Sequence, residues 1–367
     1  MNFPLSFVVF MFVLFFYIHI NDQYKKSQDL EIYELEYKGI ENLQETCNVK
    51  QPVVFNFAPM ITKYAPINLD IISSIEKEDG NTLNVKDTTD YYNVVNGIDI
   101  VPAEVPLPFH NTIQLIKTDN STTPHFFTEN NHEFIEETGV DGVMIKIGDA
   151  FLKPNYTVNQ TFDIMTAGKG VGLPMRYHTY TRKYIYVSTG RIVVKMAPFK
   201  NVKKLDFNEQ LLVSPMNCWN PQQRFISHVN KIRFLDFDIT KGHVLYVPPY
   251  WVYSILYNEN DTCLLEYNYQ TAMNIVAHPR GVICSLKNAV QSVVSSFGGG
   301  GGHENEKTRD GSMDGTTDDA IDSTMNNKYL RKRKDSTNDD TDDETESIAE
   351  SEYDLSVVTT TKPSTTN

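Results

Sequence analysis

Two stretches decide how this chain is expected to fold: MRYHTYTRKYIYVSTGRIVV (175–194) and GHVLYVPPYWVYSILY (242–257). Both are rich in Tyr, Val and Ile, residues that pack well on the pleated surface of a sheet. Each also contains turn residues, an STG run at 188–190 and a Pro-Pro pair at 248–249. Similar short runs continue along the chain with few helical signals between them. The pattern predicts an all-β barrel or sandwich with a few short helices.

The composition of the 367-residue chain excludes some functions. Hydrophobic residues make up 40% and aromatic residues 11%, which is enough for a sizeable core. The formal net charge of −14 argues against a nucleic-acid partner, because phosphates require a basic surface. The cysteines are widely spaced and lack metal-ligand spacing, which predicts free thiols in a reducing compartment. They are Cys47, Cys218, Cys263 and Cys284.

The N-terminal segment has the character of a membrane helix. Residues 3–20, FPLSFVVFMFVLFFYIHI, contain no Asp, Glu, Lys or Arg. As a helix they would extend about 27 Å, close to the thickness of the hydrocarbon core of a bilayer. No basic residue precedes the run and no small-residue cleavage site follows it, which favours an uncleaved anchor over a signal peptide. We therefore expect residues 1–20 to form a single-pass transmembrane anchor.

The charges beside this anchor indicate its orientation. Lys25, Lys26 and Lys38 follow it, so the positive-inside rule favours a cytosolic position for the rest of the protein. Glycosylation triplets would favour the opposite side, although a chain rich in Asn and Thr contains such triplets by chance. They start at Asn120, Asn155, Asn159 and Asn260.

The remaining chain divides into three parts by composition. We expect a polar tether at 21–46, a folded domain at 47–290, and a disordered tail at 291–367 that is first Gly-rich and then acidic. The best helical signal inside the domain is TENNHEFIEETG (128–139), with Thr128 as the expected N-cap and Gly139 as the stop.

Four segments in order resemble one family: KQPVVFNF (50–57), MTAGKGVGLPMRYHTYTRKYIYVSTGRIVVKMAPFK (165–200), SPMNCWNP (214–221) and FDITKGHVLYVPPYWVYSILY (237–257). They are similar to the cupin-like, JmjC-related domains, which fold as a double-stranded β-helix (a cupin or jelly-roll barrel). The resemblance covers roughly residues 47–285. Membrane-anchored chains with a Pro-Pro-Tyr-Trp rim also resemble proteins of large DNA viruses of protists and of algae.

The resemblance implies where an Fe(II)/2-oxoglutarate oxygenase would hold its metal and cosubstrate. Such a site needs two His and one carboxylate on one face, and the family pairs the cosubstrate with a basic residue. In this chain the first His is His178, but Tyr180 stands at the carboxylate position and Tyr253 at the second His position. Ile192 occupies the position of the basic residue. A neutral phenol is a poor substitute for a carboxylate, so we expect a degenerate site without metal or cofactor.

Neighbouring residues offer alternative ligands. His228 and His243 could rebuild a metal site, and Lys195 could replace the missing basic residue. Arg176 and Arg182 fall on the same face as His178 if the strand continues that far, where they could contact an anion or simply extend into solvent.

The aromatic residues around His178 suggest either a ligand pocket or a plug. His178, Tyr180 and Tyr253 should converge in the barrel mouth, together with Tyr250 and Trp251. Aromatic walls with a few hydroxyls suit a neutral ligand such as a sugar or a peptide side chain. The same rings could instead fill the space that a cofactor would occupy.

Three functions remain open from the sequence. The first is a membrane-tethered, catalytically silent barrel that binds an unknown protein or small molecule. The second is an Fe(II)/2-oxoglutarate-dependent hydroxylase with a non-standard ligand set. The third is a barrel that binds or modifies a sugar without iron. Loss of three of the four family positions favours the first.

Overall fold

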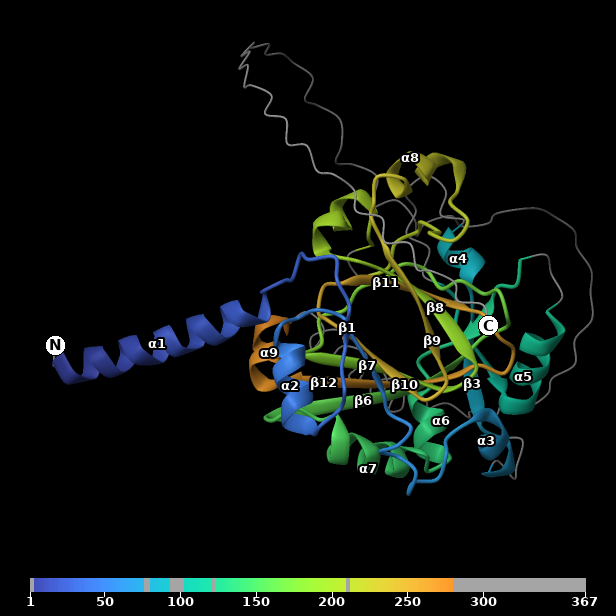
Figure 1. Cartoon of the computed structure of the whole chain (residues 1–367), viewed down its shortest axis with the longest axis horizontal. Helices are drawn as coiled ribbons and strands as arrows, with labels where there is room; N and C mark the ends of the chain where they lie inside the picture. Colours follow the sequence, from blue (N-terminus) through green and yellow to red (C-terminus); the bar gives the residue numbers. More distant parts are fainter. Residues whose placement is uncertain (1–2, 76–79, 93–101, 120–122, 209–211, 280–367) are drawn as a thin grey trace, which may run out of the picture. The chain divides into compact units, whose positions relative to one another are not determined.

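The structure of the chain is a computed structural model (Figure 1). The predicted tail and Cys284 lie outside the residues that it describes. In the described part, helices account for 33% and strands for 30%. The expectation of a strand-dominated fold is therefore only partly right. The described residues are 3–75, 80–92, 102–119, 123–208 and 212–279.

The largest sheet has six strands in the order β1-β2-β10-β7-β12-β6. All neighbours are antiparallel except β1 and β2, which run parallel. The apolar and aromatic runs recognised in the sequence form its centre. The strands are β1 (Tyr33–Glu34), β2 (Val53–Asn56), β6 (Thr157–Thr166), β7 (Arg182–Thr189), β10 (His243–Val247) and β12 (Cys263–Thr271).

A second sheet packs against one face of the first. It contains β11 (Val252–Tyr257), β8 (Arg191–Ala197) and β9 (Leu235–Thr240), in that order. Residues 172–176 extend it through bridges to β11. The inner faces of the two sheets share one hydrophobic core, because alternate residues of each strand point inward. Members of this core include Ile185, Leu245, Leu264, Ile192, Val194 and Ile255.

Helices cover the other face of the six-stranded sheet, as Figure 1 shows for α2, α6 and α7. A second core lies there between helix residues such as Leu43, Phe134 and Met144 and strand residues such as Phe55 and Tyr267. The expected tether at 21–46 therefore contains β1 and part of a packed helix. These helices are α2 (Ile40–Asn48), α3 (Leu69–Ile75), α6 (His132–Glu137) and α7 (Asp141–Phe151).

A third, smaller sheet has the order β4-β3-β5. It joins the main sandwich where Phe127 bridges Ala167. Its strands and nearby helices are β3 (Thr82–Asp87), α4 (Thr88–Tyr92), β4 (Val105–Pro108), α5 (Phe109–Thr118) and β5 (Phe126–Thr128). The remaining short helices are η1 (Phe199–Lys204), η2 (Gln223–Phe225), α8 (Ile226–Val229) and α9 (Ala272–Ala277).

The helix expected at 128–139 is shorter than predicted. It begins at His132 with Asn131 as N-cap, so the assignment of Thr128 as N-cap was wrong. Thr128 instead ends β5, where it pairs with Val85 of β3, because strand pairing outcompetes the local capping signal. The prediction that Gly139 stops the helix is confirmed, because Gly139 follows the C-cap residue and has φ of +68°.

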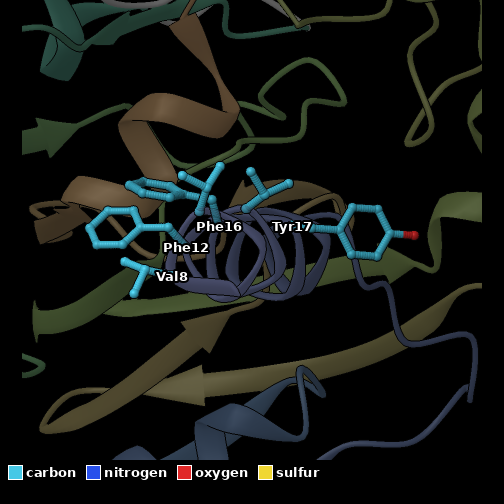
Figure 2. A pocket seen from close by; sticks show the side chains of 6 residues that line it. Val8, Phe12, Phe16 and Tyr17 are labelled. Atoms are coloured by element: carbon cyan, nitrogen blue, oxygen red, sulfur yellow. The ribbon is translucent and has the colours of Figure 1, made fainter. Parts of the chain in front are cut away.

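The N-terminal helix α1 (Phe3–Gln23) is apolar on all sides. Its segment Leu5–Gln23 is long and apolar enough to cross a membrane, and none of it is buried in the protein. A signal sequence has the same character. Figure 2 shows a shallow groove along the helix surface, with Val8 and Phe12 on one side and Tyr17 pointing away from them.

Candidate functional site

A cavity of about 840 Å³ opens between the two main sheets and the small sheet. Strands of all three sheets contribute to its wall, and so does the segment 176–180, which precedes β7. The apolar core of the sandwich fills the rest of the space between the main sheets. One end of the sandwich is thus polar and hollow, and the other is packed.

His178 lies in the wall of this cavity and is almost fully buried. Its Nε2 donates a hydrogen bond to the carbonyl of Val247, 3.0 Å away. Burial, together with the nearby ammonium of Lys183, holds the pKa of His178 well below its usual range. The ring is therefore neutral at pH 7, and its Nδ1 is a buried acceptor without a hydrogen-bond partner among the described residues.

Tyr180 and Tyr253, at the positions that the resemblance would give to metal ligands, meet His178 in the cavity wall. The ring centroids of His178 and Tyr180 are 5.8 Å apart, and those of His178 and Tyr253 are 6.4 Å apart. Burial raises the pKa of both phenols, so both stay protonated at neutral pH. The structure thus brings together three of the five residues expected in the pocket.

The other two, Tyr250 and Trp251, do not line the cavity. Trp251 is fully buried in the sandwich core. Tyr250 has φ of +66° and its ring stacks on Tyr177, with 6.4 Å between the ring centroids. Its hydroxyl contacts Nε2 of His278. The turn after the Pro-Pro pair directs the side chains of Tyr250 and Trp251 away from the cavity, where the sequence predicted them.

The alternative ligands also lie away from the cavity. Ile192 is buried in the sandwich core. Lys195 lies over the ring of Trp219, with Nζ 4.8 Å from its centroid. His243 contacts Thr240 at the start of β10, and His228 lies on α8. Ile192 only marks the position of the basic residue, and the three alternatives, His228, His243 and Lys195, do not line the cavity with His178.

The two arginines expected beside His178 separate. Arg176 lines the cavity. Arg182 bonds to Gln44 and Asn48 of α2 on the opposite face of the sheet, so the expectation for it was wrong. The expected alternation of side chains between the two faces of a strand does not apply here. β7 begins only at Arg182, and the residues between the two arginines are not in a strand.

A buried ion-pair network forms one wall of the cavity. Glu129 pairs with Arg176 and with Lys86, whose Nζ lies 3.4 Å from its carboxylate. Lys86 also pairs with Glu104 at 2.8 Å. Burial alone would raise the pKa of Glu129, but Arg176, Lys86 and Lys183 together lower it to about 2. Glu129 is therefore ionised throughout the physiological range.

A second ion pair lies on the wall formed by the six-stranded sheet. Lys183 of β7 pairs with Glu266 of β12, and both side chains are buried. Behind them, the carboxylate of Asp163 accepts hydrogen bonds of 2.8 Å from the backbone N–H groups of Asn130 and Asn131. These bonds fix the segment that follows Glu129. Burial and the charge of Glu266 raise the pKa of Asp163 to about 7.

The charges of the wall are balanced. Three cationic and three anionic side chains line the cavity, and each belongs to an ion pair. Nη2 of Arg176 is buried without a hydrogen-bond partner among the described residues. Buried polar groups left unpaired cost about 1–3 kcal/mol each, so a water or a polar ligand that reached this donor would be stabilising.

The residues present do not fit an Fe(II) site. The positions implied by the resemblance supply one imidazole and two neutral phenols. The imidazole nitrogen Nε2 is engaged by a backbone carbonyl. In the described part of the chain, no group of three His, Cys, Asp or Glu side chains is arranged to hold a metal ion. The nearest carboxylates are committed to ion pairs with Lys and Arg.

Apart from Arg176, the sequence did not point to the charged residues of the site. Lys183 and Glu266 stand inside apolar strand runs, RKYIYV and CLLEYNY, in phase with inward-facing residues. That phase was a usable signal, because a charged residue at a core position requires a buried partner. Lys86 and Glu129 gave no such signal, since Lys86 lies in β3 and Glu129 directly follows β5, in a sheet that the sequence pattern did not reveal.

Comparisons with protein-family models and with curated sequences find no relative. The function therefore has to be inferred from the residues of the cavity and their chemistry.

Proposed function

We propose that this protein is a membrane-anchored, cupin-like barrel that binds a neutral, hydroxyl-rich ligand such as a sugar, and that it does not perform Fe(II)/2-oxoglutarate chemistry. The observation that carries the proposal is the cavity itself. His178, Tyr180 and Tyr253 meet there, at the positions where the resemblance would place metal ligands.

The strand order supports the cupin-like assignment. In chain order, β6, the segment 172–176, β7, β8, β9, β10, β11 and β12 make eight successive extended segments. The first, third, sixth and eighth lie in one sheet, and the second, fourth, fifth and seventh lie in the other. Such an alternation between two facing sheets is expected of an eight-stranded jelly roll.

The chemistry of the wall supports a neutral ligand. Because every lining cation already has a carboxylate partner, a charged ligand would have to displace an existing ion pair. Hydroxyl groups both donate and accept, so a polyol could use the phenols of Tyr180 and Tyr253 without disturbing those pairs. The aromatic faces of these tyrosines would pack against the C–H groups of a sugar ring.

Ligand binding can be tested with the full-length protein in detergent. Isothermal titration with a panel of neutral saccharides should reveal saturable binding. Tyr180→Phe should weaken it about five-fold, because the loss of one hydrogen bond costs about 1 kcal/mol. Tyr156→Phe is the matched control, since Tyr156 is 89% exposed and does not line the cavity. No binding by any saccharide, or equal effects of the two variants, would contradict the proposed ligand class.

Loss of oxygenase chemistry needs a separate measurement. The full-length protein and His178→Ala are titrated anaerobically with Fe(II) and 2-oxoglutarate. We expect neither stoichiometric iron nor saturable cosubstrate binding in either protein. Stoichiometric iron and cosubstrate binding that are both lost in the variant would instead establish a hydroxylase with a non-standard ligand set.

The proposed location is a membrane with the folded domain on the cytosolic side. The support is the exposed, apolar α1 and the lysines that follow it, Lys25, Lys26 and Lys38. Protease protection in sealed vesicles tests the orientation. In vesicles whose cytosolic face points outward, we expect external protease to cleave the domain. Protection of the domain would instead place it on the opposite side of the membrane.

A further inference from the structure

The C-terminal end of α1 is fastened to one end of the folded domain. The hydroxyl of Tyr24 donates to the carbonyl of Ala277 in α9, and Lys50 donates to the carbonyl of Asp22. Asn274 of α9 also donates to Oε1 of Gln23 at 3.4 Å. Figure 1 shows α1 leaving the domain directly beside α9. Contacts just after α1 therefore set which end of the domain lies nearest to it.

Lys26 strengthens this junction. Its Nζ lies 3.2 Å from the centroid of the Phe199 ring and 4.5 Å from that of Tyr250. A cation over two aromatic faces is attracted by both. The role of Tyr250, which does not line the cavity, is thus to hold the chain that leads out of α1.

Exposed apolar residues gather at the same end. Tyr156 and Val158, at the start of β6, are 89% and 60% exposed, and Val276 of α9 is 54% exposed. The start of β6 pairs with the end of β12, where Thr157 lies opposite Thr271, and α9 begins at the next residue. Val49, beside the Lys50 that contacts α1, is also exposed.

The opposite end of β12 is polar. The turn before that strand contains Glu259, Asn260 and Asp261, all of them exposed. β12 has nine residues, so the two ends are about 30 Å apart. Among the described residues outside α1, nine large apolar side chains are exposed, and five of them lie at the junction with α1: Tyr24, Val49, Tyr156, Val158 and Val276. The other four, Tyr33, Ile75, Val105 and Ile226, belong to β1, α3, β4 and α8.

We propose that Tyr24, Val49, Tyr156, Val158 and Val276, here called the α9 face, rest on the surface of the phospholipid bilayer that α1 spans. The inference depends on the proposed function, in which α1 is retained as a membrane anchor. Tyr side chains favour the interface because their rings are apolar and their hydroxyls remain hydrated. The valines lose contact with water there. Lys25 pairs with Asp22, but its side chain is 66% exposed and can approach anionic head groups.

This contact has a consequence for the ligand site. Asn159 of β6 and Ile275 of α9 line the cavity and belong to elements that carry the α9 face, and Gln270, which also lines the cavity, lies opposite Asn159 in the sheet. Asn159 and Gln270 bond to each other through their side chains at 2.9 Å. The wall of the cavity at this end thus lies at the bilayer surface.

The contact can be measured with single cysteine labels in the full-length protein. A Cys284→Ser background leaves only Cys47, Cys218 and Cys263, which are buried. An environment-sensitive fluorophore is attached at Tyr156→Cys, at Val276→Cys or, as the matched control, at Glu259→Cys. Val13→Cys reports on α1. The proteins are placed in vesicles of phosphatidylcholine and phosphatidylserine that carry spin-labelled lipid as a quencher.

The labels at positions 156 and 276 should lose most of their fluorescence to the lipid quencher and should resist aqueous iodide. The label at position 259 should behave in the opposite way. If position 13 is quenched by lipid while 156 and 276 behave like 259, the α9 face does not touch the bilayer, and the anchor itself stands. If position 13 is not quenched either, the anchor is lost and the inference with it.

Discussion

Arg176 and Tyr253 exchange two backbone hydrogen bonds, of 2.9 and 2.8 Å, between distant parts of the sequence. Directly opposed residues in an antiparallel pair present their side chains on the same face. Both side chains accordingly reach the cavity, where Arg176 pairs with Glu129, the residue that follows β5 of the small sheet. One strand pairing thus joins the family-like tyrosine position to the ion-pair network.

Removing the charge of Glu129 should destabilise the protein strongly. Glu129→Gln leaves Arg176 and Lys86 buried with less compensation, which typically costs about 3–5 kcal/mol. Glu104→Gln is the matched control, because Glu104 is 43% exposed and its loss should cost less than about 1 kcal/mol. Urea unfolding followed by the fluorescence of the two tryptophans, Trp219 and Trp251, measures both effects. If both variants lose the same unfolding free energy, water screens the charges of the ion-pair network.

The same carboxylate should make stability depend on acid pH. The pKa of Glu129 is about 2 in the folded protein, against an ordinary value of 4.5. A lowered pKa in the folded state contributes stability that is fully present above pH 4.5 and is lost as the pH falls toward 2. The difference in unfolding free energy between the parent and Glu129→Gln should therefore shrink across that window. A constant difference would show that Glu129 titrates normally.

A metal site should be recoverable at the three family-like positions. Tyr180→Asp combined with Tyr253→His would place two His and one carboxylate around the cavity wall, the donor set of a non-haem iron site. We expect one Co(II) per chain by visible absorption, where the parent shows none. Adding His178→Ala should abolish binding. Failure of the double variant to bind Co(II), although it folds, would mean that the positions do not correspond to the family ligands.

The hairpin between β7 and β8 should require glycine. Gly190 has φ of +79°, and an added Cβ would lie 2.8 Å from Cα of Thr262. Gly190→Ala should therefore destabilise the protein by about 1–3 kcal/mol from backbone strain alone. Gly142→Ala in α7 meets nothing within 4 Å and should stabilise by about 0.5–1 kcal/mol. Thermal unfolding of the two variants measures both effects. An unchanged stability of Gly190→Ala would indicate that the turn rearranges to accept the added Cβ.

Much of the fold was predictable because its signals are local. The apolar run at 3–20 predicts α1, and the Tyr- and Val-rich runs predict the central strands. His178 and Tyr180 both line the cavity, although the segment that carries them is not a strand. The helical share was underestimated, because short amphipathic helices such as α2 and α7 obtain their stability from packing on a sheet rather than from strong propensity.

By itself, the sequence determined the apolar N-terminal helix and the main strands, and it drew attention to His178, Tyr180 and Tyr253. Only the tertiary structure decided that Tyr250 faces the chain leaving α1 and that Glu129 joins Arg176 in the cavity wall. The reason is physical. Periodicity and propensity act over a few residues, whereas the partner of a buried charge is chosen by strand pairings between distant segments.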